Sequence, residues 1–292
     1  KIFKKGDFIL GNDVTRFENN FSNFCNSKYS IGCANGTDAL TIALKSLNLK
    51  KNSEVIIPAM TYCSTAFSVI NANLKPVLVD TEFMKSTIDI LQIKKKINKK
   101  TKVIMPVHLY GSVVNIKEIK KIIKNKNIFI IDDCAQAHGA KDIYGKKVGS
   151  LADISTFSLY PGKNLGAYGD AGVITTNNKK FYRIIKKIRN LGSEVKFKHD
   201  LVGMNSRLDS LQSIILNHKL KQLPKLNSKR RKIASEYDNK IINKKIEKLR
   251  YSKFSIYHQY VLIVKKRNEF IKYLKKAKIL AQFKKISKEN NF

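Results

Sequence analysis

With 292 residues, 43% of them hydrophobic, the chain is long and apolar enough to bury a large core, which excludes a disordered protein. The net charge of +35 would suit a nucleic-acid partner, but only eight of the 57 basic residues are arginine, the side chain that dominates base and phosphate recognition. Because 23 basic and five acidic residues fall within 219–292, we interpret the excess as solvated surface and predict no nucleic-acid partner.

Short apolar runs alternate with helical patterns along the first 220 residues. Most of the runs are continuously apolar, which predicts strands buried on both faces of a largely parallel sheet. In chain order we predict a helix within residues 8–24, a strand and a helix within 31–49, a strand at 54–58, a helix ending at Asn71, strands at 76–80, 103–108 and 128–132 with a helix at 116–124, strands at 154–159 and 172–176, and helices at 181–191 and 206–220.

The composition changes after Pro224 to a lysine-rich helical pattern. A strand at 257–264 and a helix at 268–279 follow. We therefore predict a large domain over residues 1–220 and a small C-terminal α/β domain over residues 221–292. No apolar run is long enough to cross a bilayer, and no signal peptide is recognised, so we predict no membrane insertion.

The loop around Lys163 is the most unusual stretch of the sequence. It follows the apolar run 154–159, begins with a Pro-Gly pair, and contains three further glycines after Lys163, at 166, 169 and 172. Burial disfavours the ammonium form of a lysine, so we expect the pKa of Lys163 to be lowered and its free amine to be available for Schiff-base chemistry. The setting predicts that Lys163 is the covalent anchor of pyridoxal phosphate.

Two adjacent carboxylates end the predicted strand at 128–132. In open α/β sheets, ligands bind beyond the carboxyl ends of the strands. Asp133 could keep a pyridine nitrogen protonated, and Gln136, three residues on, could hydrogen-bond the phenolic oxygen of the ring. The alternative is that Asp132 and Asp133 only cap the following turn, an interpretation that the sequence would favour if Lys163 were absent.

Three other features suit the remainder of such a cofactor. Gly36, Thr37 and Asp38 begin a predicted helix, where backbone N–H groups and the helix dipole favour a phosphate, although a plain helix cap is the commoner explanation. Ser158 is a second candidate for the phosphate, or an ordinary strand serine. Tyr62 could stack on a flat ring, although an aromatic side chain is more often part of the core.

Other kinds of site are not supported. There is no dinucleotide-binding GxGxxG after a strand, no Walker spacing around the lysine and no GxSxG elbow. The histidines lack metal-ligand spacing, so we predict no metal, although His258 could border a substrate site. The cysteines have no paired spacing, which predicts reduced thiols and a cytoplasmic protein: Cys25, Cys33, Cys63 and Cys134.

Taken together, these motifs resemble the DegT/DnrJ/StrS family of nucleotide-sugar aminotransferases. The matching stretches cover roughly nine-tenths of the chain in consistent order, which makes the likeness far more specific than a single motif. They read FILGNDVTRFENNF, GTDAL, IPAMTY, VHLYG, DDCAQAHGA, FSLYPGKNLGAYGDAG, NSRLDSLQ and YHQYVL. The resemblance implies a fold-type-I, aspartate-aminotransferase-like enzyme, with a mostly parallel mixed sheet flanked by helices.

The resemblance also implies roles for single residues around the ring. Lys163 matches the Schiff-base lysine of the family, and Asp133 matches the partner of the pyridine nitrogen. Gln136 matches the contact to the ring hydroxyl. Tyr62 matches the stacking aromatic.

The phosphate site implied by the resemblance draws on two subunits. Gly36, Thr37, Asp38 and Ser158 match the phosphate-binding positions of the family. Asn205 matches an asparagine that the neighbouring subunit contributes. The resemblance therefore implies a homodimer with shared active sites.

For substrates, the resemblance implies glutamate as amino donor and a keto-deoxy sugar nucleotide as acceptor. The sequence around Lys163 is closest to members that aminate C3 of a dTDP-linked 3-keto-6-deoxyhexose, which serves surface-polysaccharide or amino-sugar biosynthesis. Amination of a UDP-4-keto sugar and a truncated, non-catalytic family member are the alternatives, because residues 281–292 depart from the family pattern. Relatives that remove a hydroxyl group carry histidine in place of the lysine, so they match less well.

Overall fold

A computed structural model describes residues 6–124, 126–195 and 197–281. The predicted departure at the chain end therefore lies, from residue 282 onward, outside the described residues. The main strands are β1 (Tyr29–Cys33), β2 (Glu54–Pro58), β3 (Lys75–Val79), β4 (Thr101–Ile104), β5 (Phe129–Asp133), β6 (Ile154–Ser158) and β7 (Gly172–Thr176). The helices are α2 (Asn12–Cys25), α3 (Gly36–Ser46), α4 (Cys63–Asn71), α5 (Ile90–Lys96), α6 (Ile116–Ile122), α7 (Lys179–Arg189), α8 (Ser210–Lys240) and α9 (Arg267–Lys276).

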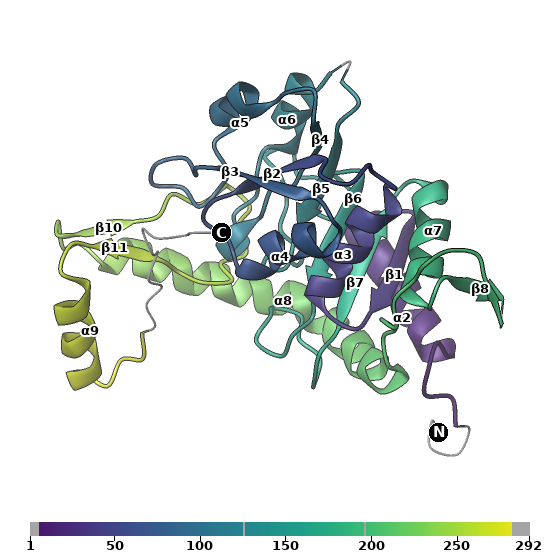
Figure 1. Ribbon diagram of the computed structural model, residues 1–292. Coiled ribbons are helices and arrows are strands. Elements are labelled where there is room, and N and C mark those ends of the chain that lie inside the picture. Colours follow the sequence, from purple (N-terminus) through teal and green to yellow (C-terminus); the bar gives the residue numbers. More distant parts are fainter. Residues whose placement is uncertain (1–5, 125, 196, 282–292) are drawn as a thin grey trace.

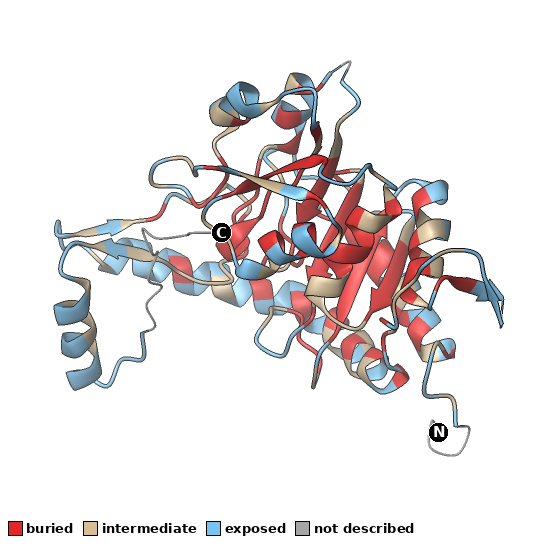
Figure 2. Ribbon diagram, in the orientation of Figure 1, coloured by how far each residue is buried: buried red, intermediate tan, exposed pale blue. Residues whose placement is uncertain are grey.

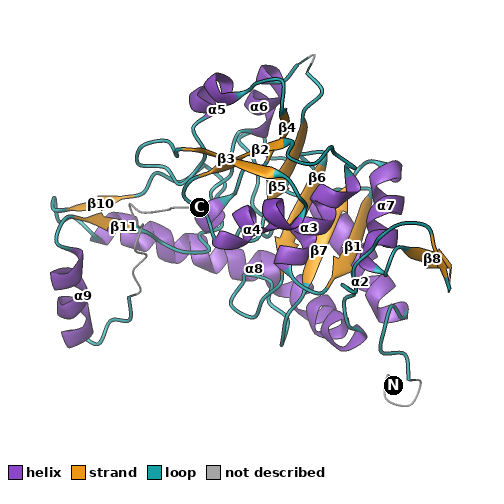
Figure 3. Ribbon diagram, viewed as in Figure 1, coloured by secondary structure: helices purple, strands orange, loops and turns teal. Residues whose placement is uncertain are grey.

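The seven main strands form one mixed sheet in the order β1-β7-β6-β5-β4-β2-β3 (Figure 3). Strands β2 to β6 pair in parallel, whereas β7 runs antiparallel to both of its neighbours, β1 and β6. Because the parallel strands share one direction, their carboxyl ends lie along a common edge. This confirms the predicted fold class of a mostly parallel mixed sheet flanked by helices.

Each face of the sheet carries its own hydrophobic core, and the buried residues concentrate between the layers (Figure 2). Neighbouring residues of a strand point to opposite faces, so a continuously apolar strand supplies both cores. Ile56 and Ile130 join one core, which α2, α5, α6 and α8 cover. Val55 and Ile131 join the other core, under α3, α4 and α7. The apolar runs of the sequence are continuous for this reason.

Helix α8 is longer than the sequence indicated. It runs unbroken through Pro224 and crosses the boundary predicted at residue 220, where we had expected two separate helices (Figure 1). Proline removes the hydrogen bond to the carbonyl four residues earlier, and its ring crowds that carbonyl, so packing along α8 must offset both effects. The division into domains 1–220 and 221–292 stays a prediction.

The C-terminal elements extend away from the main sheet (Figure 1). Strands β10 (Ile246–Lys248) and β11 (Leu262–Val264) form a two-stranded antiparallel ribbon, and α9 follows it. The predicted strand 257–264 is shortened to β11, because Tyr257 has a left-handed backbone (φ 46°) that interrupts an extended run. A second small ribbon pairs β8 (Ser193–Val195) with β9 (Lys198–His199). No helix in the described part of the chain is both long and apolar enough to span a bilayer.

Candidate active site

Polar side chains converge where β5 and β6 end and where α3 and α4 begin. Asp133 is the last residue of β5 and Ser158 the last residue of β6. The structure therefore brings together groups from residues as distant in the sequence as Gly36 and Ser158. It adds two residues that the sequence analysis missed, Ser64 and Thr65, in the first turn of α4.

Asp133 is buried, with 5% of its surface exposed, and each carboxylate oxygen accepts a hydrogen bond. The backbone N–H of Ala135 donates to Oδ1 at 3.0 Å, and the hydroxyl of Thr65 donates to Oδ2 at 3.0 Å. Burial raises the pKa of Asp133, while these two donors and the charge of Lys163 act in the opposite direction. The two hydrogen bonds therefore hold the carboxylate in a fixed orientation. A cationic partner would favour its charged form.

The neighbouring Asp132 has a different role. Its Oδ2 accepts a hydrogen bond at 3.1 Å from Nε2 of His108, whose Nδ1 accepts from the backbone N–H of Val114. Consecutive strand residues point to opposite faces, so only one of the two carboxylates reaches the site. Ligand atoms of His108, Asp132 and Cys134 lie within 4.8 Å of one another, but both ring nitrogens of His108 already have partners. Both ring nitrogens of His108 are thus satisfied by internal hydrogen bonds, whereas Oδ1 of Asp132 has no partner among the described residues.

Lys163 is half-buried in a tight loop after β6. Its backbone N–H donates to the carbonyl of Tyr160 at 2.9 Å, and Ala167 closes the loop by donating to Leu159 at 2.8 Å. Burial lowers the pKa of Lys163, as the sequence predicted, and the nearby negative charge of Asp133 partly opposes this shift. The free amine is therefore populated at a lower pH than in an exposed lysine.

The start of α3 packs closely against the end of β6. A Cβ atom added to Gly36 would lie 2.5 Å from Cβ of Ser158, so only glycine allows this approach. The hydroxyls of Thr37 and Ser64 share a hydrogen bond of 2.8 Å. Helix N-terminal N–H groups and three hydroxyls thus face one another, an arrangement that suits a phosphate.

The helix cap itself is Asn35 rather than Thr37. The Asn35 side chain accepts a hydrogen bond of 2.8 Å from the backbone N–H of Asp38, which lies in the first turn of α3. The cap lies two residues before Thr37, the residue predicted for that position, whereas Asp38 does lie in the first turn as predicted. With Asn35 as the cap, the hydroxyl of Thr37 remains available to a ligand.

Gln136 and Tyr62 each keep a group that a ligand could contact. Oε1 of the buried Gln136 accepts a hydrogen bond of 2.7 Å from the backbone N–H of Tyr110, which leaves its amide N–H groups as donors. Tyr62 immediately precedes α4 and is 66% exposed, so it is not a core aromatic. Its ring is accessible for stacking.

Two hydrogen bonds join the lysine loop to distant parts of the chain. Asn164 follows Lys163 directly, and its Oδ1 accepts a hydrogen bond of 2.8 Å from Nδ1 of His258. Its amide nitrogen donates to Oδ1 of Asn227 on α8 at 3.0 Å. His258 thus holds the loop that carries Lys163. The sequence had indicated only that His258 could border a substrate site.

Asn205 shares a cavity with Ala34, which lies two residues before the start of α3. It is exposed, and the cavity, of about 410 Å³, is also lined by Asp170 and Arg207. No hydrogen bond described within the chain connects Asn205 to Gly36, Thr37 or Ser158. Within the described part of the chain, Asn205 therefore has no direct hydrogen bond to the candidate phosphate site.

The assembled groups match the chemistry of pyridoxal phosphate. An amine (Lys163), a buried carboxylate (Asp133) and a free amide donor (Gln136) suit the aldehyde, the ring nitrogen and the phenolic oxygen of the cofactor. The first turn of α4 links this part to the candidate phosphate site, because Ser64 contacts Thr37 and Thr65 contacts Asp133. The chemistry of this donor set fits the group.

Comparison with known proteins gives a consistent picture. Residues 1–285 match the family model described as the DegT/DnrJ/EryC1/StrS aminotransferase family. A dTDP-3-amino-3,6-dideoxy-alpha-D-galactopyranose transaminase of Aneurinibacillus thermoaerophilus is 43% identical over 96% of this chain and 77% of its own length. A UDP-2-acetamido-2-deoxy-3-oxo-D-glucuronate aminotransferase of Pseudomonas aeruginosa is 36% identical over 95% of this chain and 77% of its own. The crystal structure of DesV of S. venezuelae in complex with ketimine intermediate has a TM-score of 0.92 and 31% identity, covering 95% of this chain and 76% of DesV.

Proposed function

The chain belongs to the DegT/DnrJ/EryC1/StrS aminotransferase family, and we propose that it transfers the amino group of glutamate to C3 of a dTDP-linked 3-keto-6-deoxyhexose. At the coarser level it is a pyridoxal-phosphate-dependent nucleotide-sugar aminotransferase. The observation that carries the proposal is the pairing of a half-buried Lys163 with a buried Asp133 beside the start of α3.

In this proposal, Lys163 has two tasks. Bound pyridoxal phosphate supplies an aldehyde that exchanges amino groups and a ring that accepts an electron pair from the substrate carbon. Nζ of Lys163 anchors the cofactor covalently and, once released, removes a proton from the amino-bearing carbon of glutamate. The lowered pKa of Lys163 suits this step because a neutral amine is the base. In the second half-reaction the same nitrogen returns a proton to C3 of the sugar.

The other site residues hold and polarise the cofactor. Asp133 keeps the ring nitrogen protonated, and Thr65 fixes the orientation of that carboxylate. Gln136 donates to the phenolic oxygen, and Tyr62 covers one face of the ring. The N–H groups at the start of α3, with the hydroxyls of Thr37, Ser64 and Ser158, hold the phosphate.

The choice of C3 is supported by the named relatives. Both curated relatives described above are named for amination at position 3, although one name contains a dTDP-sugar and the other a UDP-sugar. The 43% relative favours dTDP. A UDP-linked acceptor is the second candidate, because the identities of the two relatives differ little.

We also propose a homodimer in which Asn205 completes the phosphate site of the neighbouring subunit. The exposure of Asn205, which has no described hydrogen bond to Ser158 within its own chain, supports this arrangement. Mixing two impaired variants, Lys163→Ala and Asn205→Ala, tests it, because each mixed dimer contains one intact shared site. Recovery of activity on mixing supports sharing. No recovery, with mixed dimers demonstrated by tagged subunits, overturns it.

The substrate is tested by mass analysis of products formed from a panel of dTDP- and UDP-linked keto sugars with ¹⁵N-labelled glutamate. We expect ¹⁵N to enter a dTDP-3-keto sugar, with NMR locating it at C3, and no product with Lys163→Ala. A UDP-linked product would support the second candidate. A deoxygenated product without ¹⁵N, or no product from any acceptor, would contradict transamination.

A further inference from the structure

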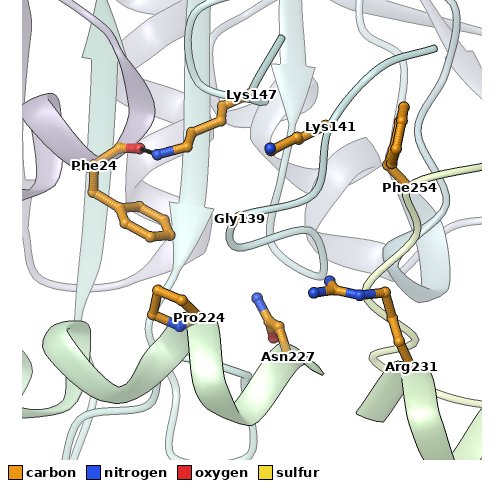
Figure 4. Close-up of a pocket in the computed structure, with 8 residues that line it drawn as sticks. All are labelled: Phe24, Gly139, Lys141, Lys147, Pro224, Asn227, Arg231 and Phe254. Carbon is orange, nitrogen blue, oxygen red and sulfur yellow. Dashed lines mark hydrogen bonds between the residues drawn. The ribbon is translucent and has the colours of Figure 1, made fainter. Parts of the chain in front are cut away.

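A separate hollow lies along α8, and Asn227 in its wall accepts a hydrogen bond from Asn164, the residue after Lys163. The hollow is a cavity of about 320 Å³ lined by Lys141, Lys147, Asn227, Arg231 and the rings of Phe24 and Phe254. Figure 4 shows the cationic side chains of Lys141 and Arg231 directed toward the space between the hairpin 141–147 and α8. None of the residues assigned to the cofactor lines it.

The cavity is cationic and has no acid to balance it. No carboxylate lines it, and neither Lys141, Lys147 nor Arg231 pairs with a carboxylate among the described residues. The acid nearest in sequence, Asp142, accepts hydrogen bonds from the N–H groups of Tyr144 and Lys146, so its own turn occupies it. Like charges held around one hollow repel, and an anion placed among them removes that cost.

Part of the wall is rigid. Asn227 is 3% exposed, and both ends of its amide have partners: it accepts from Asn164 and donates to the carbonyl of His138 at 2.8 Å. Nζ of Lys147 donates to the carbonyl of Phe24 at 2.5 Å. Gly139 has φ +84°, and a Cβ there would lie 2.9 Å from the ring of Phe24. A side chain at this position would fill the hollow, so glycine keeps it open.

The lining also indicates what kind of anion fits. Lys141 and Arg231 provide mobile cations for a phosphate, whereas Phe24, Phe254 and Pro224 form apolar walls. A volume of about 320 Å³ lies at the lower end of the range for small-molecule sites and exceeds what a bare phosphate needs. We propose that this cavity binds a phosphate monoester of a small organic molecule, with Lys141 and Arg231 holding the phosphate.

The proposal is tested by isothermal titration calorimetry on the cofactor-loaded protein with glucose 1-phosphate, UMP and inorganic phosphate. Loss of one charge-assisted contact should weaken ester binding roughly tenfold or more in Arg231→Ala and in Lys141→Ala. Matched controls are Arg230→Ala and Lys146→Ala, neighbours that do not line the cavity, and we expect less than about a twofold change. Arg231 and Lys141 are exposed, so their truncation should leave the fold intact, which thermal melting verifies.

The two esters distinguish a sugar phosphate from a nucleotide as the occupant. Inorganic phosphate binding as tightly as both esters would overturn the organic part of the proposal. Ester binding that is absent, or equally tight in Arg231→Ala, Lys141→Ala and the controls, would overturn the site itself, because the ligand would then sit elsewhere. The inference does not depend on the sugar substrate proposed above. Ester binding can persist when transamination fails, and transamination can be observed when the ester does not bind.

Discussion

The hydroxyl of Thr65 donates a hydrogen bond of 3.0 Å to Oδ2 of the buried Asp133. A hydroxyl has one hydrogen, so in the 2.8 Å contact between Thr61 and Thr65 the donor is Thr61. The two threonines therefore form a directed chain that ends on the carboxylate. This chain connects α4 to the end of β5 and orients the group proposed to contact the ring nitrogen.

Replacing Thr65 by valine keeps the shape and removes the donor to Asp133. A buried acceptor that loses its partner costs about 1–3 kcal/mol, so we expect kcat to fall roughly ten- to a hundredfold. Steady-state kinetics and the absorbance of the bound cofactor measure the effect. Thr61→Val is the control, because Thr61 does not touch Asp133. Equal kcat values in the two variants would contradict a direct role for Thr65.

Gly36→Ala tests the close approach between α3 and β6. The added Cβ would meet Cβ of Ser158 at 2.5 Å and its Cα at 3.0 Å, so the helix start must move. Overpacking of this kind costs about 1–3 kcal/mol, and we expect cofactor affinity to fall roughly tenfold or more. Equilibrium dialysis with pyridoxal phosphate measures it. Adding Ser158→Gly to this variant removes the closest contact, so stability measured by urea unfolding should recover. Cofactor affinity should not recover fully, because the Ser158 hydroxyl is absent. No recovery would contradict the steric explanation.

The lowered pKa of Lys163 predicts how the stability of the cofactor-free protein depends on pH. Below about pH 10.4 the unfolded chain holds the proton of this lysine, whereas the folded chain has begun to release it at a lower pH. The unfolded state then binds more protons, so the free energy of unfolding should rise with pH between the folded pKa and about 10.4. Lys163→Met should lack this rise. Urea unfolding of both proteins across alkaline pH measures the difference; parallel curves would contradict it.

The lowered pKa of His138 predicts how the stability of the protein changes at acidic pH. Burial and the charge of Lys163 lower its pKa to about 3, and Nε2 donates to the carbonyl of Ser158 at 2.9 Å, which leaves the ring neutral. In the unfolded chain it titrates near 6.5, so the unfolded state binds the extra proton between those values and stability falls as pH falls. The slope amounts to about 1.4 kcal/mol per pH unit.

The measurement for His138 compares urea unfolding of the wild type with His138→Gln from pH 7 to pH 4. We expect the variant to be less stable at pH 7 and to lose stability less steeply on acidification. His218, an exposed histidine on α8, is the control, since His218→Gln should leave the slope unchanged. A steep loss that persists in His138→Gln would assign the acid sensitivity to another group.

Much of the fold and of the site could be predicted because it depends on local patterns. Continuous apolar runs determine buried strands, and the glycines around Lys163 and Gly36 mark where the backbone must turn or approach another element. Since parallel strands share an edge, the polar residues at their ends were expected to meet. The predicted end of a helix at residue 220 was wrong, because packing along α8 outweighs the cost of Pro224 inside the helix.

The sequence by itself determined the chemical groups of this protein: an amine in a glycine-rich loop, carboxylates at a strand end and hydroxyls at helix starts. The tertiary structure decided which of them act together. It turned Asp133 toward Thr65 and Asp132 toward His108, because neighbouring strand residues face opposite ways. It also made Ser64 and Thr65 contact two different partners, since consecutive helix residues point about 100° apart. Such contacts depend on how separate elements are placed in space, and no local pattern records that placement.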